Sequence, residues 1–358
     1  MRLGYHTGYW STGPPPGVSE AVQQAERLGF DSVWTAEAYG SDAFTPLAWW
    51  GAHTSTIRLG TAIAQLAART PTATAMAALT LDHLCGGRFT LGLGVSGPQV
   101  VEGWYGQPYP RPLARTREYV AIVREVLARE APVAFDGEFY TLPLRAGTGL
   151  GKPLRSTVHP LRADLPIHLA AEGPKNIALA AEIADGWLPL FYSPRMDAGY
   201  RELLADGFAR RGTSPGRGPG PREQFEVSAT VPVVVADDVQ QAADAVRPFI
   251  ALYAGGMGAK GANFHRDVLV RLGYGDACDE IQAHFLAGRR AEAAAAVPLE
   301  LVQDVALVGP PAKIRADLAR WQQTAVTTIV VQGDANALAV VAAALGTDRQ
   351  PADVAAAR

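Results

Sequence analysis

Short apolar runs alternate along the chain with longer segments in which apolar residues recur at helical spacing. Runs that are apolar at successive positions are typical of strands buried on both faces, as in a parallel sheet covered by helices. The pattern predicts eight strands, near residues 3–5, 32–34, 57–62, 89–93, 166–170, 186–190, 227–235 and 327–332, with helices such as 18–28, 45–54 and 72–84 between them. This alternation indicates an α/β fold, a (β/α)8 TIM barrel, because an open doubly wound sheet needs fewer strands.

The alternation is not interrupted as it would be between two domains, so we expect one barrel domain over residues 1–347. Two stretches, near 133–164 and 255–304, do not fit the repeat and are expected to be insertions that shape a substrate pocket. The first contains Asp136-Gly137, a hairpin signal. The tail at 348–358 is expected to be flexible.

Three glycines at the end of the fourth strand, Gly92, Gly94 and Gly97, have the spacing of a dinucleotide fingerprint. Their context differs from that motif, because three strand and helix pairs precede them and no acidic strand end follows about 20 residues later. We also expect Pro98 to block immediate entry into a helix. The run therefore indicates a glycine-rich barrel loop beside a cofactor, not a Rossmann fold.

A second candidate cofactor contact follows the fifth strand, over residues 171–176. Gly173 lets the backbone approach a ligand, Pro174 suits a first helical turn, and the free N–H groups of a helix start attract anions. Lys175 adds a positive charge, and Ser96 with the Gly97 amide would complete a phosphate cradle. An ordinary capped helix start explains the same residues.

Composition narrows the function classes. The chain is 48% hydrophobic with a net charge of −3, which makes nucleic acid an unexpected partner. No apolar run approaches the roughly 18 residues of a membrane span, and no signal peptide is evident, so we expect a cytoplasmic protein. Cys85 and Cys278 are expected to be reduced core residues, and the seven His residues lack metal-site spacing, so no metal is expected.

Several segments together resemble the bacterial luciferase-like superfamily, and most closely its actinobacterial oxidoreductases that depend on coenzyme F420. They are residues 34–42, 58–63, 80–89, 91–106, 170–176 and 184–187. The resemblance implies coenzyme F420 as cofactor, hydride transfer to a small organic substrate such as an unsaturated or carbonyl compound, and a homodimer. A monooxygenase using reduced FMN and a non-catalytic deazaflavin-binding protein are the alternatives.

The resemblance also assigns cofactor-binding positions. It implies a non-proline cis peptide at Ala62-Ile63 beneath the deazaflavin ring. The full set of cofactor-binding residues is Ala62, Ile63, Gln65, Ser96, Gly97, Pro98, Gln99, Ala171, Glu172, Gly173, Pro174, Lys175 and Asn176.

Several residues near the strand ends are candidates for the group that handles the proton. Glu37 occupies the position of an acidic residue near the ring, but Ala38 stands where some relatives carry a catalytic His, and Gly97 aligns with a catalytic Glu of others. His6, Glu37 and Tyr39 are the candidate catalytic residues, with Glu172 nearby by topology. A hydrogen-bonded barrel histidine is the alternative for His6, and a core or barrel-lining role is favoured for His168.

Aromatic side chains near the predicted strand ends are expected either to wall a ring-binding pocket or to pack in the core. They are Tyr9, Trp10, Trp104, Trp187, Phe191 and Tyr192. Trp49, Trp50 and Met76, on predicted helices, are candidates for an apolar outer face that binds a second copy, or they pack those helices on the barrel.

Overall fold

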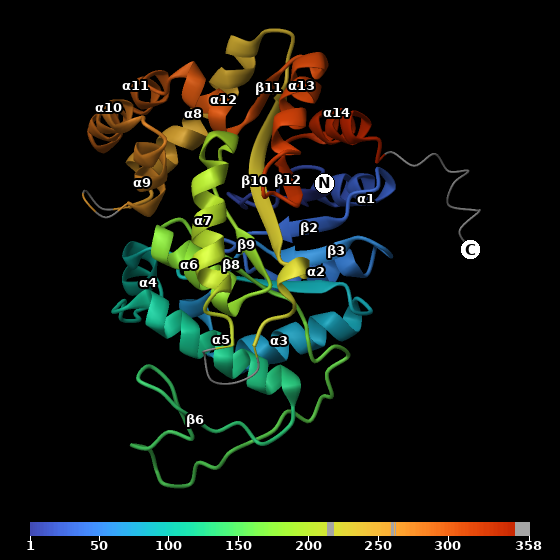
Figure 1. The fold of residues 1–358 in the computed structure, drawn as a ribbon, viewed down its shortest axis with the longest axis vertical. Helices are drawn as coiled ribbons and strands as arrows, with labels where there is room; N and C mark the ends of the chain where they lie inside the picture. Colours follow the sequence, from blue (N-terminus) through green and yellow to red (C-terminus); the bar gives the residue numbers. More distant parts are fainter. Residues whose placement is uncertain (213–217, 259–260, 262, 348–358) are drawn as a thin grey trace, which may run out of the picture.

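The protein is a closed barrel of parallel strands surrounded by helices (Figure 1). A computed structural model describes residues 1–212, 218–258, 261 and 263–347, so the predicted tail at 348–358 lies outside the described residues. The barrel strands are β1 (Arg2–His6), β2 (Ser32–Thr35), β3 (Arg58–Thr61), β5 (Phe89–Gly94), β8 (Ile167–Ala170), β9 (Gly186–Leu188), β10 (Glu226–Val235) and β12 (Thr328–Gln332). Pairing of β9 with β10 and of β12 with β1 closes the ring. The TIM-barrel prediction is confirmed.

Helices cover the outer face of the barrel, since the parallel strands are joined by crossovers. They are α1 (Val18–Arg27), α2 (Phe44–Gly51), α3 (Pro71–Leu84), α4 (Pro98–Gly103), α5 (Pro112–Ala128), α6 (Pro174–Ile183), α7 (Asp197–Phe208), α8 (Val239–Gly255), α13 (Pro311–Trp321) and α14 (Ala335–Leu345). Single 3₁₀ turns lie at Leu66–Ala68, Pro194–Met196 and Arg222–Gln224. None of the described helices has the length and hydropathy needed to cross a membrane.

Large side chains fill the inside of the barrel. Trp34 is fully buried beside Leu188 and Val330, and its ring stacks on His168 with centroids 5.8 Å apart. Glycines opposite these rings provide the space: a Cβ on Gly60 would lie 2.3 Å from the Trp34 ring. The barrel-lining role favoured for His168 is confirmed, and the packed interior leaves the strand ends as the place for a site.

Two of the fingerprint glycines serve packing between strands. A Cβ on Gly92 would lie 1.7 Å from the Thr61 carbonyl oxygen, and one on Gly94 would lie 2.7 Å from the Ile63 side chain. In place of a backbone ladder, the Gly92 N–H donates to Thr61 Oγ1 (2.9 Å) and Thr61 Oγ1 donates to the Gly92 carbonyl (2.6 Å). The prediction that this run is not a Rossmann fingerprint is confirmed, because the glycines let β3 and β5 approach each other closely.

One expectation about local structure is wrong, and one short strand was not predicted. Helix α4 begins directly at Pro98, with Gly97 as its N-cap, because proline suits a first helical position whose N–H would have no intrahelical partner. A short strand that the pattern did not predict, β11 (Leu307–Gly309), pairs with Val233–Val235. The ten-residue β10 supplies this edge at its carboxyl end, after the residues that pair with β12.

The first insertion forms the predicted hairpin, with β6 (Phe135–Asp136) antiparallel to β7 (Thr141–Leu142). It follows the carboxyl end of α5 and returns to the amino end of β8, so it lies at the end of the barrel opposite the strand carboxyl ends, at the bottom of Figure 1. Arg162 of this insertion binds Asp82 of α3. None of its described residues lines the large cavity at the carboxyl ends of the barrel strands, so the expectation that this insertion shapes the pocket is wrong.

The second insertion forms helices at the other end of the molecule (Figure 1). They are α9 (Phe264–Arg271), α10 (Gly275–Leu286), α11 (Arg290–Ala295) and α12 (Leu299–Val305). Together with α8 they bury a hydrophobic cluster separate from that of the barrel. Phe264 and His265 of α9 line the cavity, which confirms the pocket-shaping expectation for this insertion.

The Gly92 contact gives a stability prediction. Gly92→Ala is expected to lower the free energy of unfolding by about 3 kcal/mol or more, because a Cβ cannot fit without backbone movement. Urea unfolding measures this change. Gly199→Ala in α7, where a Cβ meets nothing within 4 Å, is the matched control and is expected to gain up to about 1 kcal/mol. Equal stabilities of the two variants would contradict the packing role.

Candidate active site

A cavity of about 1130 Å³ opens at the carboxyl ends of the barrel strands. Of the residues assigned to a site from the sequence, only Pro98 does not line it. The lining ones are His6, Glu37, Tyr39, Ala62, Ile63, Gln65, Ser96, Gly97, Gln99, Ala171, Glu172, Gly173, Pro174, Lys175 and Asn176. The topology of the barrel thus brings together segments that are distant in the sequence.

The floor of the cavity contains the non-proline cis peptide Ala62-Ile63, as the resemblance predicts. The Ala62 N–H donates to the Thr35 carbonyl at 2.6 Å, and the Glu37 N–H donates to the Ile63 carbonyl at 3.1 Å. After this bond the chain forms β4 (Ala64–Gln65), which pairs with the end of β5. The cis segment is therefore fixed by both neighbouring strands.

Glu37 is buried beside this segment, and its carboxylate is fully engaged. Arg69 donates from Nη1 to Oε2 at 2.9 Å and from Nη2 to Oε1 at 2.8 Å, and the Gln65 N–H donates to Oε2 at 2.8 Å. Arg69 also binds Asp42. Bidentate pairing with an Arg fixes the orientation of a carboxylate. The sequence left an electrostatic or a proton-handling role open for Glu37, and the contacts with Arg69 and Gln65 favour a positioning role.

The other two catalytic candidates differ in burial. His6 is buried, and its Nδ1 accepts a hydrogen bond from the Gly8 N–H at 3.0 Å. Burial lowers the pKa of His6 to about 4, and a hydrogen bond to the Ala62 backbone opposes part of that shift. The imidazole is neutral at pH 7 and can donate from Nε2. Tyr39 lies at the rim, 61% exposed.

Two helix starts face the cavity with uncapped N–H groups. Gly173 precedes α6 and Gly97 precedes α4, and no side chain caps either helix. A Cβ on Gly173 would meet nothing within 4 Å, so the backbone there is open to a ligand. Ser96 adopts a positive φ of 58°, which turns the chain from β5 into the α4 start. With Lys175 alongside, this arrangement provides the donors and positive potential that an anion requires.

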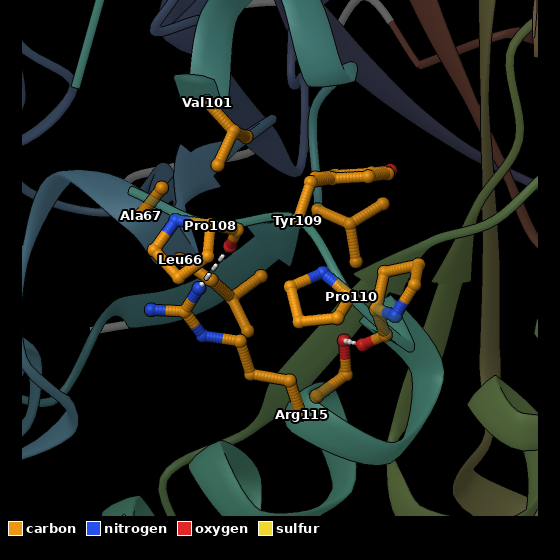
Figure 2. Close-up of a pocket in the computed structure, with 10 residues that line it drawn as sticks. Leu66, Ala67, Val101, Pro108, Tyr109, Pro110 and Arg115 are labelled. Carbon is orange, nitrogen blue, oxygen red and sulfur yellow. Dashed lines mark hydrogen bonds between the residues drawn. The ribbon is translucent and has the colours of Figure 1, made fainter. Parts of the chain in front are cut away.

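The corner between α4 and α5 supports the Ser96 side of this arrangement. Tyr109 donates from its hydroxyl to the Ser96 carbonyl at 2.9 Å, and Arg115 donates to the Pro108 carbonyl at 2.9 Å. Figure 2 shows these side chains around a hollow of only about 20 Å³, too small for more than a water molecule or methyl group. The corner is therefore a packed support, and the ligand space lies in the large cavity.

A hydrogen-bonded pair that sequence reasoning missed lies on the insertion side of the cavity. His265 Nδ1 is 2.5 Å from Glu172 Oε1, and the ring of Tyr253 meets the His265 ring edge-on at 4.8 Å. Tyr253 donates to the Tyr9 hydroxyl at 3.2 Å, and burial raises the pKa of both phenols. Glu172 and His265 are 93 positions apart, and no motif links them, so the fold alone reveals the pair.

The predicted aromatic wall is confirmed for only part of the set. Tyr9 and Trp104 line the cavity. Trp187, Phe191 and Tyr192 are buried in the hydrophobic clusters, where the core-packing alternative applies. Trp187 nevertheless supports the site, because its Nε1 donates to the Ala171 carbonyl at 2.8 Å.

The model of the luciferase-like monooxygenase family matches residues 4–328. The chain belongs to this family. A relative from Mycobacterium tuberculosis, provisionally named a coenzyme F420-dependent oxidoreductase, is 58% identical over 92% of this chain and 94% of its own. The resemblance predicted from the sequence is confirmed.

Two solved structures share the barrel of this luciferase-like chain. The coenzyme F420-dependent tetrahydromethanopterin reductase of Methanopyrus kandleri has a TM-score of 0.78 at 21% identity and covers 95% of this chain and 97% of its own. The oxygenating constituent of 3,6-diketocamphane monooxygenase from Pseudomonas putida, solved with FMN, has a TM-score of 0.65 at 16% identity over 96% and 97%. The two use different cofactors, so the fold by itself does not select one.

The buried Glu37 and Arg69 pair gives a second prediction. Arg69→Met leaves the carboxylate without its cation and is expected to lower the free energy of unfolding by about 3 kcal/mol. Denaturant unfolding checks this. Arg201→Met, which removes an exposed pair with Asp197, is the control and is expected to cost less than about 1 kcal/mol. Similar losses of unfolding free energy in both variants would show that the buried Glu37 and Arg69 pair stabilises the fold no more than an exposed pair does.

The buried imidazoles predict a pH dependence of stability. Burial lowers the pKa of both His6 and His168 to about 4, whereas an unfolded histidine titrates near 6.5. Between these values the unfolded state binds protons that the folded state does not, so stability falls as pH is lowered from about 6.5 to about 4. His6→Asn is expected to reduce that slope by about one proton, while His53→Asn, an exposed control, leaves it unchanged. An unaltered slope in His6→Asn rules out this contribution.

Proposed function

We propose that this luciferase-like protein is an oxidoreductase that transfers a hydride between coenzyme F420 and a small organic substrate, most simply by reducing an unsaturated or carbonyl compound. The main support for this function is the arrangement at the barrel mouth, where two uncapped helix starts and Lys175 adjoin the Ala62-Ile63 floor. The relative at 58% identity, named for the same cofactor, gives the proposal its choice of ligand.

The cavity residues fit a deazaflavin with an anionic tail. A flat ring suits the floor of Ala62 and Ile63 below the mouth, and a phosphodiester suits the N–H groups of Gly173 and Lys175. The amide oxygen of Gln65 is buried without a hydrogen-bond partner among the described residues, although its Nε2 donates to the Ala38 carbonyl at 2.8 Å. A ring N–H would satisfy that oxygen.

The separate roles of the cofactor and of the protein side chains follow from this fit. When bound, the cofactor supplies or accepts the hydride at ring carbon C5. The chain's own residues bind the anionic tail, orient the ring and exclude water from the buried floor. Because the carboxylate of Glu37 is held by Arg69, its part is to keep the Gln65 segment in place.

An FMN-dependent monooxygenase is the second candidate, because the monooxygenase solved with FMN has the same fold. FMN also carries a phosphate and a ring N–H, so the cradle and Gln65 suit it as well. The candidates differ in chemistry: a deazaflavin lacks the ring nitrogen N5 that supports an oxygen adduct. A deazaflavin-binding protein without turnover is the third reading.

We further propose a homodimer in the cytoplasm. The adjoining helices α2 and α3 expose Trp49, Met76 and Leu84, each more than half exposed, and an apolar face of this kind suits a second copy of the chain. Trp50, named with them from the sequence, is buried and packs in the core. Cys85 and Cys278 are free thiols, which suit a reducing compartment.

Cofactor preference tests the proposal directly. Titration of the purified protein with oxidised F420 and, separately, with FMN is expected to show tighter binding of F420, weakened at high salt because an anion is bound. Tighter binding of FMN with oxygen consumption would establish the monooxygenase instead. Tight F420 binding without turnover of any hydride acceptor would support a deazaflavin-binding protein without catalytic activity.

The proposed phosphate-binding role of the α6 helix start can be tested by introducing a side chain there. Gly173→Val places a side chain in open space, so the fold is expected to remain intact while F420 affinity falls at least about tenfold, since lost charge-assisted contacts cost over 1 kcal/mol. Lys175→Ala is expected to weaken binding and reduce its salt dependence. Lys152→Ala, in the insertion at the opposite end of the barrel, is the matched control. Wild-type affinity in both cradle variants would contradict the assignment.

A further inference from the structure

The pair formed by Glu172 and His265 differs from the structural ion pair at Glu37. Both oxygens of Glu37 accept hydrogen bonds from Arg69. In Glu172, only Oε1 is bonded, to His265 Nδ1, and Oε2 is buried with no partner among the described residues. A carboxylate that serves structure alone would be expected to have both oxygens satisfied.

His265 has one ring nitrogen to spare. Its Nδ1 is taken by Glu172, and no partner of Nε2 is found within the described part of the chain. The residue lines the cavity at the first turn of α9, and Arg271 of the same helix donates to the Glu172 carbonyl at 2.7 Å. The imidazole is therefore oriented by a carboxylate, and its helix is fastened to the loop that carries that carboxylate.

The other titratable groups around the cavity are less suited to pass a proton to a substrate. His6 is neutral and buried, Glu37 is fully bonded, and Tyr39 lies at the exposed rim. Tyr109 donates its hydroxyl proton to the Ser96 carbonyl. His265 combines an available nitrogen in the cavity lining with a carboxylate partner that fixes the orientation of its ring.

The surroundings of His265 indicate the kind of substrate. The cavity wall next to it is apolar and aromatic, formed by Leu190, Phe249, Tyr253, Met257 and Phe264. The polar groups on this side are the Tyr9 and Tyr253 hydroxyls and the His265 pair. A molecule with an apolar body and one hydrogen-bond acceptor matches this wall.

We propose that His265, oriented by Glu172, protonates the carbonyl oxygen of an apolar aldehyde or ketone as the carbonyl carbon is reduced. The proposal rests on the proposed function, which supplies the reductant. His265 is then a catalytic residue, and Glu172 is a positioning residue that acts through it.

The step balances as a two-electron reduction. A hydride from the reduced cofactor forms a C–H bond at the carbonyl carbon, and the C=O π pair moves to the oxygen. That oxygen takes a proton from His265 Nε2, so the imidazolium becomes neutral with Nδ1–H still donated to Glu172. The carbonyl is reduced to an alcohol, the cofactor is oxidised, and solvent returns the proton to His265.

Two classes of hydride acceptor separate this role from a structural one. Benzaldehyde and 2-octanone need a proton on oxygen, whereas N-methylacridinium, already cationic, accepts a hydride and needs no proton. With reduced F420, His265→Gln is expected to lower kcat for benzaldehyde and 2-octanone about 10²–10⁴-fold with little change in KM. The rate of acridinium reduction is expected to stay within about threefold of the wild-type rate. Glu172→Gln is expected to lower kcat for the two carbonyl probes by a smaller factor than His265→Gln does.

His284→Gln is the matched control. His284 lies on α10, with a side chain 28% exposed against 27% for His265, beside the carboxylate of Glu280 at 3.9 Å. It does not line the cavity, so both reactions are expected to proceed at wild-type rates.

Two readouts do not depend on turnover. Fluorescence titration is expected to give an unchanged F420 dissociation constant for His265→Gln. Nitrogen-15 NMR of labelled imidazoles is expected to show a hydrogen-bonded Nδ1–H in His265 that changes in Glu172→Gln. Weaker F420 binding with unchanged kcat would mean that the imidazole contacts the cofactor, and would overturn the proposal, as would the absence of that hydrogen bond.

The outcomes distinguish a failure of the His265 proton role from a failure of the proposed F420-dependent function. Equal losses for carbonyl and acridinium in His265→Gln overturn the proton role and leave the proposed function standing. A wild type that reduces acridinium but neither carbonyl overturns the substrate class. A wild type that reduces none of the probes overturns the proposed function, and the proton role with it.

Discussion

The close approach of β3 to β5 is the contact on which the site depends. It exists because Gly92 has no side chain to strike the Thr61 carbonyl, and because Thr61 Oγ1 supplies the hydrogen bonds that the backbone ladder omits there. Gly94 then leaves room for Ile63, so the segment after β3 can lie against the end of β5. Glu37 and Arg69 fasten that segment from the other side. The floor of the cavity is thus determined by packing and one ion pair before any ligand binds.

Much of the fold was predictable from the sequence, because strands buried on both faces leave continuous apolar runs. The features that the sequence did not predict are those that depend on the three-dimensional surroundings of a residue more than on its neighbours in the sequence. Pro98 was interpreted as a barrier although proline at the first helical position is compatible with α4. The strand β11 has three residues and pairs only with the end of a long neighbour. Trp49 and Trp50 are adjacent in the sequence, yet helix geometry exposes one and buries the other.

The site was predictable to the extent that it is built from strand ends. Every assigned residue except Pro98 reaches the cavity, since a barrel gathers the carboxyl ends of its strands at one mouth. The roles of the residues were harder to infer, because they depend on partners. Glu37 resembles a catalytic acid until Arg69, which follows the cis segment and a 3₁₀ turn, is seen to hold it. His265 gave no signal, because its partner Glu172 lies in a distant strand end.

The two sides of the cavity belong to different hydrophobic clusters. The helix starts at Gly97 and Gly173, proposed to bind phosphate, belong to the barrel, whereas His265 and much of the aromatic wall belong to α8 and the insertion helices, which bury a separate cluster. Substitutions that reshape the insertion cluster therefore disturb few contacts of the barrel. This separation favours evolvability. Substitutions in the insertion cluster can change which substrates are accepted during drift and selection, while the barrel side keeps its cofactor.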